Sequence, residues 1–141
     1  SNPHCNPCAR MHQQVEQLLG LSGDGICIQY IFAAFNERLE DSCRYLISCY
    51  LCNSTSEALN HFSSWYTKDK FDYREVIKKE EASLHSKRIE EEMDKHKAWR
   101  KRTSLNATPT VLVNGHKLPN EYELIDLSMI VDNILNEEFV L

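Results

Sequence analysis

Residues 2–14 read NPHCNPCARMHQQ, and this stretch decides how the rest of the chain is interpreted. Two residues separate Cys5 from Cys8, and a run of helix-forming composition follows at once. Such a pair can be half of a zinc site, a structural disulfide, or a dithiol that exchanges electrons with other thiols. Each interpretation needs different surroundings, so the remaining sequence has to distinguish them.

The segment after Cys5 has the signals of a helix start. Asn6 can cap a helix, and Pro7 suits the first helical position, where its missing N–H costs nothing. We therefore predict a helix that ends near Gly20, with Cys5 just outside it. Apolar side chains fall on one face of this helix at helical spacing, and they are Cys8, Met11, Val15, Leu18 and Leu19.

A buried strand is predicted directly after this helix. Residues 26–35, ICIQYIFAAF, form a nearly continuous run of β-branched, aromatic and other apolar side chains. A strand covered on both faces, as in a parallel sheet between helices, has this composition. Cys27 lies within the run, so we expect it to be a small core residue.

The chain beyond this strand divides into a helical middle and a short strand-and-helix end. Residues from about 39 to 104 show no second strand pattern, and we predict a helical insertion of that extent. A hairpin is predicted at 110–118, because Asn114-Gly115 favours a two-residue turn between strands. Apolar spacing over 124–135 predicts a closing amphipathic helix.

The length and charge of the chain disfavour several classes of function. A length of 141 residues suits one domain, so we assign 1–141 to a single domain. The net charge of −5 disfavours binding to nucleic acid. No apolar run is long enough to span a membrane, and the first residues carry no signal-peptide pattern.

Residues 68–102 hold 12 Lys and Arg against 9 Asp and Glu. We interpret them as a solvated helix face, with a docking surface for an acidic partner as the alternative.

Two motifs together indicate a known family. One is Cys5-Asn6-Pro7-Cys8 at a helix start, and the other is Thr108-Pro109 directly before a strand, hairpin and helix. In this order, with a helical insertion between them, they resemble the thioredoxin superfamily and in particular its DsbA-like branch. The resemblance implies an α/β, thioredoxin-like fold with an inserted helical subdomain. It also implies a cis-proline at Pro109 that faces the cysteine pair.

A narrower resemblance concerns the partner. The stretches NPHCNPCARMH (2–12) and GHKLPNEYEL (115–124) are similar to the thioredoxin-like domain fused to bacterial vitamin K epoxide reductase homologues. That likeness implies a periplasmic or otherwise extracytoplasmic domain that exchanges disulfides with a membrane-embedded, quinone-linked domain, fused to it in the full-length chain. The expected substrates are protein thiols and disulfides. No cofactor, no nucleic acid and no insertion of this domain into the membrane are expected.

The sequence departs from the family pattern at two points. Family members have a strand before the cysteine pair, whereas only four residues precede Cys5 here, so we expect the first strand to be missing. Many relatives also have a buried acid that assists proton transfer. Residues 26–35 offer Gln29 and no carboxylate for that task.

Its position at a helix start suits Cys5 to act as the attacking thiol. Thiol–disulfide exchange needs a thiolate that attacks and a second thiol that resolves the mixed disulfide. The helix dipole and free N–H groups lower the pKa of a thiol from about 8.5 into a range of about 3.5 to 7.5. We therefore expect Cys5 to attack and Cys8 to resolve. Asn6 and Pro7 would shape the turn between them, and a protonated His4 would stabilise the thiolate.

The resemblance also implies a substrate-binding role for Thr108 and Pro109. The backbone of Thr108, held by cis-Pro109, would pair with an extended partner strand like an added sheet edge. Replacing Cys5 by Ser is then expected to abolish activity. The rival hypothesis is a thioredoxin-like scaffold that docks a partner without catalysis, and the same replacement would leave its binding untouched.

A zinc-stabilised domain is a third hypothesis. A structural zinc site needs four ligands, and Cys49 and Cys52 share a helix face three residues apart. His4 or His12 are further candidate ligands. The combination of the cysteine pair with the Thr-Pro motif favours the oxidoreductase, and no metal is expected.

The cysteines of the predicted insertion have a simpler interpretation. Cys43, Cys49 and Cys52 are expected to pack in the core as small apolar residues. The alternative is an auxiliary disulfide from Cys43 to a cysteine elsewhere, since a bond between Cys49 and Cys52 within one helix would be strained.

Overall fold

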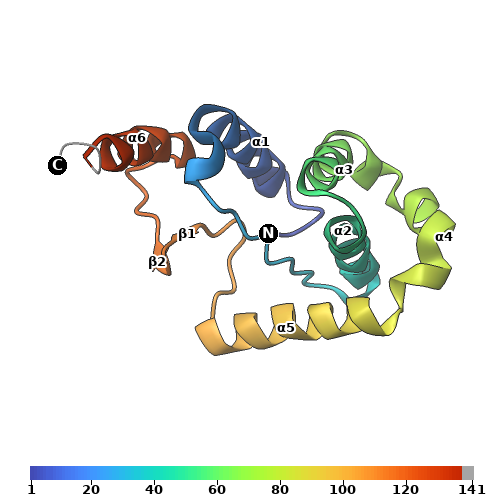
Figure 1. Ribbon diagram of the computed structural model, residues 1–141. Helices are drawn as coiled ribbons and strands as arrows, with labels where there is room; N and C mark the ends of the chain where they lie inside the picture. Colours follow the sequence, from blue (N-terminus) through green and yellow to red (C-terminus); the bar gives the residue numbers. More distant parts are fainter. Residues whose placement is uncertain (138–141) are drawn as a thin grey trace.

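The computed structural model of this chain describes residues 1–137, which are mostly helical (Figure 1). An extended segment, residues 26–34, leads from the first helix to the second. The helices and strands in chain order are α1 (Asn6–Ser22), α2 (Glu40–Cys52), α3 (Thr55–Thr67), α4 (Tyr73–Leu84), α5 (Lys87–Thr103), β1 (Leu112–Val113), β2 (His116–Lys117) and α6 (Leu127–Glu137). Short 3₁₀ turns lie at Gly23–Gly25, Glu37–Leu39, Asp69–Phe71 and Leu124–Asp126.

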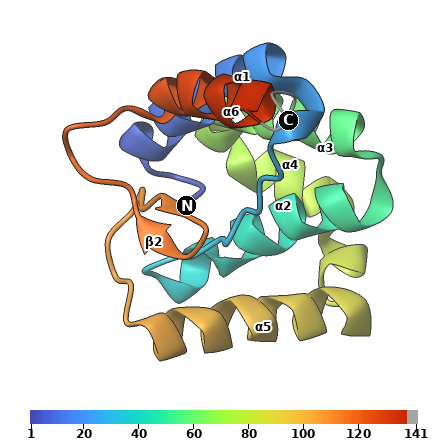
Figure 2. The same cartoon turned by 60° about the vertical axis from the view of Figure 1, so that its left-hand side comes forward.

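Helix α1 lies between two parts of the molecule. It contacts α6 and the turn before α6 on one side, and it contacts α3 on the other. Helix α2 packs against α3, α4 and α5, so these four helices form the inserted subdomain. In Figure 2, α6 lies along α1 while α5 runs along the opposite side of the molecule.

Capping chemistry sets where two of these helices begin. Helix α1 starts one residue earlier than the sequence suggests, because Cys5 rather than Asn6 is the N-cap, and Pro7 lies in the first turn. Helix α3 has the capping box of Ser54 and Glu57, in which each side chain accepts a hydrogen bond from the other residue's backbone N–H. Both the helix that carries the cysteine pair and the helix that packs against it are therefore fixed at their N-termini.

The segment predicted as a buried strand, residues 26–35, is extended but joins no sheet within the described residues. Its backbone is paired at one point. The Ser1 ammonium donates to the carbonyl oxygen of Ile31 at 2.7 Å, and the N–H of Ala33 donates to the carbonyl oxygen of Ser1 at 2.9 Å. This is the hydrogen-bond pattern of a parallel pair, here a single residue long. The prediction of a sheet strand is therefore wrong here. Apolar composition indicates a buried segment, but it does not supply the neighbouring strand that a sheet requires.

The missing neighbour also exposes part of this segment. Cys27 and Gln29 are exposed, whereas Phe32 and Ala33 are buried. The expectation that Cys27 is a core residue is wrong, because its side of the segment is left open among the described elements.

Strands β1 and β2 form the predicted hairpin in antiparallel register. The chain turns at Asn114 and Gly115, whose φ angles are 49° and 86°. A two-residue hairpin turn needs positive φ at both central positions, and Asn and Gly adopt it with little strain. The hairpin is short, and its strands span Leu112–Val113 and His116–Lys117.

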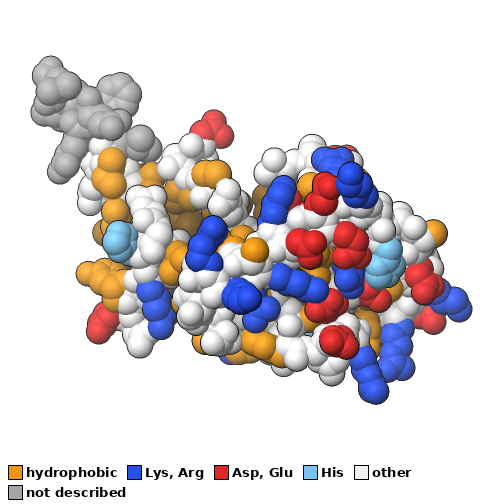
Figure 3. Space-filling view, turned by 90° about the horizontal axis from the view of Figure 1, so that it is seen from below, with side chains coloured by type: hydrophobic (Ala, Val, Ile, Leu, Met, Phe, Trp, Pro, Cys, Tyr) orange, Lys and Arg blue, Asp and Glu red, His pale blue; other side chains and the backbone are white. Residues whose placement is uncertain are grey.

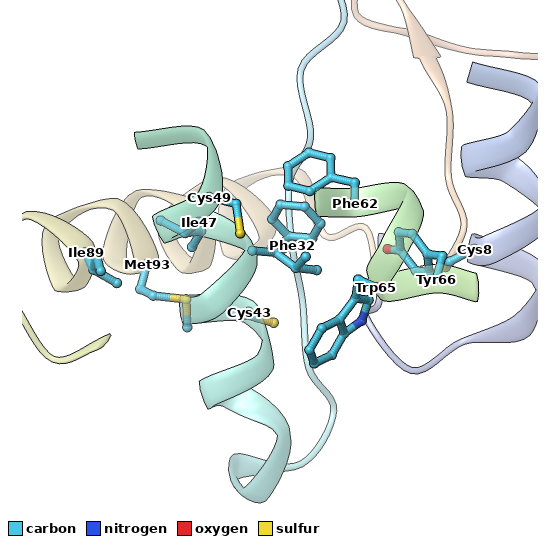
Figure 4. Close-up of a cluster of buried hydrophobic side chains, with 11 residues drawn as sticks. Cys8, Phe32, Cys43, Ile47, Cys49, Phe62, Trp65, Tyr66, Ile89 and Met93 are labelled. Carbon is cyan, nitrogen blue, oxygen red and sulfur yellow. The ribbon is translucent and has the colours of Figure 1, made fainter. Parts of the chain in front are cut away.

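The main core lies where α1, the extended segment and the inserted helices meet (Figure 4). A smaller cluster of Val15, Leu18 and Leu124 joins α1 to the turn before α6. Cys8 belongs to the main core, so the packing of the insertion also anchors the second cysteine of the pair. The buried members of the main core are Cys8, Phe32, Cys43, Leu46, Ile47, Cys49, Phe62, Trp65, Tyr66, Ile89 and Met93.

The charged surface carries both signs. Figure 3 shows acidic and basic side chains interspersed over the helical part of the molecule. Ion pairs link α5 to its neighbours, with Arg44 2.8 Å from Glu90 and Lys97 3.0 Å from Glu40. This mixture fits the interpretation of residues 68–102 as a solvated face. None of the described helices combines the length and the apolarity that crossing a membrane requires.

Candidate functional site

Cys5 and Cys8 lie at the N-terminus of α1. The sulfur of Cys5 accepts a hydrogen bond from the backbone N–H of Cys8 at 3.3 Å, as the side chain of an N-cap does. Cys5 is partly exposed, whereas only 1% of the Cys8 surface is exposed. Cys5 is therefore the more accessible of the two sulfurs.

The Thr108–Pro109 segment lies beside Cys5. The Cys5 thiol donates to the carbonyl oxygen of Thr108 at 3.8 Å, although the two residues are 103 positions apart in the sequence. The peptide bond between Thr108 and Pro109 is cis. The fold thus brings together the two motifs that the sequence analysis singled out.

Side chains of the insertion hold the loop before Cys5. Trp65 in α3 donates from Nε1 to the carbonyl oxygen of Pro3 at 2.9 Å. The ring of His4 forms a hydrogen bond through Nε2 with the hydroxyl of Ser42 in α2, at 2.8 Å. The inserted subdomain therefore positions the cysteine pair as well as closing the core.

A buried cation lies at the start of α1. Lys70, in the turn between α3 and α4, is 7% exposed, and its ammonium donates to Asn6 Oδ1 at 2.9 Å. Burial and then the charge of Lys70 lower the pKa of His4, so that ring is held neutral near pH 7. The predicted support of the Cys5 thiolate by a protonated His4 stays a prediction.

The pKa of Cys5 is raised in the reduced protein. Burial is the largest cause, and the neighbouring Cys8 thiol adds to it, whereas the N–H of Cys8 acts in the opposite direction. The sequence analysis expected the helix N-terminus to lower this pKa. Removal of the sulfur from water outweighs the hydrogen bond that reaches it, which accounts for the difference.

A cavity of about 900 Å³ opens beside the cysteine pair. Its walls come from α1, the extended segment, the stretch before and within the hairpin, and α6. Cys8 and Thr108 line it, as do His12 and Tyr30. The cavity therefore touches both motifs of the site.

The sequence analysis missed a hydrogen-bonded group at this cavity. His12 forms hydrogen bonds through Nδ1 with the hydroxyl of Tyr30 at 2.6 Å and through Nε2 with the hydroxyl of Ser63 at 3.0 Å. The Ser63 hydroxyl can donate to the carboxylate of Glu16 or to the carbonyl oxygen of Leu59, which is 2.8 Å away. A signal was present in part, because Cys8, His12 and Glu16 follow one another at intervals of four on one helix.

Three positioning residues in the insertion were missed as well. Ser42, Trp65 and Lys70 form hydrogen bonds with the residues on either side of Cys5, which we call the cysteine loop. The sequence separations are 38, 62 and 64 residues. Helical periodicity identifies a buried face but not the loop that it meets, so the sequence carries no signal for these contacts.

The other cysteines are free thiols, as are Cys5 and Cys8. Cys43 and Cys49 are buried as predicted, and burial raises their pKa to about 12 and about 11. Cys52 is exposed, so core packing is wrong for it, because it lies at the end of α2. Across residues 1–137 no group of three His, Cys, Asp or Glu side chains is arranged to hold a metal.

Comparison with known proteins adds one decisive finding. A family model described as thioredoxin matches residues 1–133, nearly the whole chain. The chain belongs to the thioredoxin family. No curated protein matches it, and no solved structure does. Family membership makes thiol–disulfide chemistry plausible for this chain, in which the Cys5 thiol contacts Thr108.

Proposed function

We propose that the protein is a thiol–disulfide oxidoreductase whose reacting groups are Cys5 and Cys8. The observation that carries the proposal is the position of the Cys5 sulfur, which lies between the N–H of Cys8 and the carbonyl oxygen of Thr108. The sulfur is partly exposed at a helix N-terminus, and its partner thiol lies buried one turn behind. A dithiol that must meet other proteins needs one accessible sulfur and one protected sulfur.

The exchange runs through a mixed disulfide. The Cys5 thiolate attacks a partner disulfide, which forms a bond between Cys5 and the partner and releases the other partner sulfur as a thiolate. The Cys8 thiol then loses its proton and attacks the Cys5 sulfur, which breaks the mixed disulfide and releases the second partner thiolate. The partner is reduced by two electrons, and Cys5 and Cys8 are oxidised to a disulfide. Read backwards, the same steps donate a disulfide.

The partner would bind beside Thr108 and Pro109. An extended peptide that pairs with the backbone at Thr108 brings its own sulfur close to Cys5. By its resemblance, the physiological partner would be a membrane-embedded, quinone-linked domain similar to vitamin K epoxide reductase, fused in the full-length chain. Such coupling would operate on the periplasmic side, where disulfides persist.

The test is thiol trapping across a series of glutathione buffers, with alkylated thiols counted by mass spectrometry. Cys27 and Cys52 are exposed, so the starting protein should carry Cys27→Ser and Cys52→Ser. One two-electron couple is expected, and it should vanish in Cys5→Ser and also in Cys8→Ser. Its midpoint gives the direction of electron flow.

Two outcomes would overturn the proposal. If Cys5 and Cys8 never form a couple, the site is not a redox centre. If partner binding survives in Cys5→Ser and no couple titrates, the non-catalytic docking scaffold is favoured. Trapping with Cys8→Ser, which leaves the mixed disulfide unresolved, would identify the partner, with the variant lacking both cysteines as its control.

A further inference from the structure

The hydrogen bonds around His12 fix its tautomer. The Ser63 hydroxyl has two groups within reach that can only accept, the ionised Glu16 carboxylate and the carbonyl oxygen of Leu59 at 2.8 Å, and it donates its one proton to one or the other. The Ser63 oxygen then accepts from His12 Nε2–H, which leaves Nδ1 unprotonated to accept from the Tyr30 hydroxyl. Burial lowers the pKa of His12, which agrees with a neutral ring. When the Ser63 hydroxyl is turned from Leu59 to Glu16, each donor in the series Tyr30, His12, Ser63 points toward that carboxylate.

The two ends of this chain lie in different environments. Tyr30 and His12 line the cavity that Cys8 also lines. Glu16 has 43% of its side chain exposed, whereas the side chain of His12 is 1% exposed. The chain therefore leads from a space next to the buried thiol to a carboxylate in contact with solvent.

The placement of His12 relative to Cys8 follows from α1. The two residues are four positions apart and face the same side of the helix, and both are buried, at 2% and 1% exposure. Their surroundings are shared as well. The ring of Tyr66, which packs in the same core as Cys8, lies 5.3 Å from the ring of His12.

The proposed exchange needs such a route. Cys8 becomes nucleophilic only as a thiolate, and only 1% of its surface is exposed, so a nearby group that accepts its proton would favour its attack. The extended segment offers no carboxylate to take that proton, as the sequence already indicated.

We propose that Tyr30, His12, Ser63 and Glu16 form a proton-transfer chain for the resolving thiol Cys8. The Cys8 proton passes through water in the cavity to the Tyr30 oxygen, and each following group hands on its own proton until Glu16 is protonated and exchanges with solvent. The Cys8 thiolate then attacks the Cys5 sulfur, and the partner sulfur leaves with the electron pair of the broken bond. This proposal rests on the oxidoreductase function proposed above. Tyr30, His12, Ser63 and Glu16 are positioning and proton-transfer residues, not catalytic ones.

A structural role alone would also satisfy a buried histidine, so the test must separate the two steps. The probe is the disulfide of thionitrobenzoate, which releases one coloured thiolate when Cys5 attacks and a second when Cys8 resolves. The protein carries Cys27→Ser and Cys52→Ser, and the two phases are followed by stopped flow from pH 6 to about pH 10, a range that spans the ordinary thiol pKa.

In His12→Phe, which keeps an aromatic ring, the second phase should slow by about 100-fold near neutral pH, the scale of general acid–base catalysis. The first phase should stay unchanged. The defect should shrink at high pH, where hydroxide removes the Cys8 proton directly. The titratable groups that face His12 are Cys8 and Glu16 on α1, Tyr30 on the extended segment and Tyr66 on α3, so Glu16→Gln should shift the same profile.

Chemical rescue provides a second readout. In His12→Ala, added imidazole should restore part of the second phase, and it should leave the first phase unaffected. Ser63→Ala breaks the chain at the hydroxyl bonded to Nε2 and keeps the His12 ring itself. It covers the case in which the histidine variants fail to fold.

The outcomes separate this proposal from the function on which it rests. Absence of two phases in the starting protein, or their survival in Cys5→Ser, would contradict the oxidoreductase itself. Two normal phases, with a second phase that His12→Phe, Ser63→Ala and Glu16→Gln leave unchanged at every pH, would overturn the proton-transfer chain alone. A slowing that is equal in both phases and at every pH would also overturn it.

Discussion

Two opposing influences act on the pKa of Cys5. Its sulfur caps α1 and accepts from the N–H of Cys8, yet burial raises its pKa above the ordinary value of a thiol. A helix N-terminus stabilises the thiolate only to the extent that its N–H groups make up for the hydration that the sulfur loses on burial. The reduced protein is therefore expected to hold Cys5 mainly as a thiol at neutral pH.

Alkylation of Cys5 by iodoacetamide should be slow at pH 7 and should rise as the pH passes the ordinary thiol value of about 8.5. The sign follows from the raised pKa, since less thiolate is present at any given pH. Peptide mass spectrometry distinguishes Cys5 from the exposed Cys27 and Cys52, of which Cys27 serves as the internal reference. Saturated alkylation already at pH 6 would contradict this prediction.

The pairing of Asn6 with Lys70 makes a second prediction at this scale. Asn6→Ala leaves a buried ammonium without its acceptor, which should lower the free energy of unfolding by about 1–3 kcal/mol. Lys70→Met should cost less, because it removes the charge together with the need to satisfy it. The double variant should then lose less free energy of unfolding than the sum of the two single losses. Urea unfolding measures all three losses. Additive losses would show that the two side chains act independently.

At the scale of elements, α5 is attached to the extended segment through one buried histidine. His96 accepts the N–H of Phe32 at Nδ1, at 3.1 Å, and its Nε2 lies 3.4 Å from the hydroxyl of Tyr50. Burial lowers the pKa of His96. A protonated Nδ1 would in addition have no lone pair left to accept the N–H of Phe32. The docking of α5 therefore depends on a neutral imidazole.

The free energy of unfolding should fall as the pH drops below about 6.5, the pKa of histidine in an unfolded chain. The folded state has the lower pKa, so below 6.5 the unfolded state binds more protons and gains stability relative to it. His96→Leu should flatten part of this dependence and cost about 1–3 kcal/mol at pH 7.5, because the N–H of Phe32 loses its acceptor. Urea titrations at pH 7.5 and 5.5 measure both effects, with exposed His116→Asn as the control. An unchanged pH dependence in His96→Leu would contradict the assignment.

Local chemistry allowed several elements to be predicted from the sequence, and distant contacts explain the failures. The start of α1, the hairpin at Asn114-Gly115 and the closing helix follow from capping, turn and periodicity rules. The strand at 26–35 failed as a sheet member, because a strand needs a neighbour and composition does not supply one. At the site, the two motifs were found in the sequence, but the partners of His12 lie 18 and 51 residues away and left no pattern.

At the scale of the whole molecule, the amino terminus lies in the middle of the structure (Figure 1). The Ser1 ammonium donates to the carbonyl oxygen of Ile31, and its side chain hydroxyl lies 2.7 Å from that of Tyr66. Burial lowers the pKa of this amine from 8.0. Ser1 therefore joins the extended segment to α3 through both its backbone and its side chain.

A few buried side chains of the insertion contact the loop around Cys5. None of these side chains lies on the outer face of the insertion. Over evolutionary time, charged positions on the outside of α4 and α5 are free to drift, provided that the balance of signs is kept. Ser42, Trp65 and Lys70 lack that freedom, because each holds an atom of the loop around Cys5. We therefore expect related sequences to differ most in the inserted subdomain. Within it they should keep Ser42, Trp65 and Lys70, although no local motif marks these three residues.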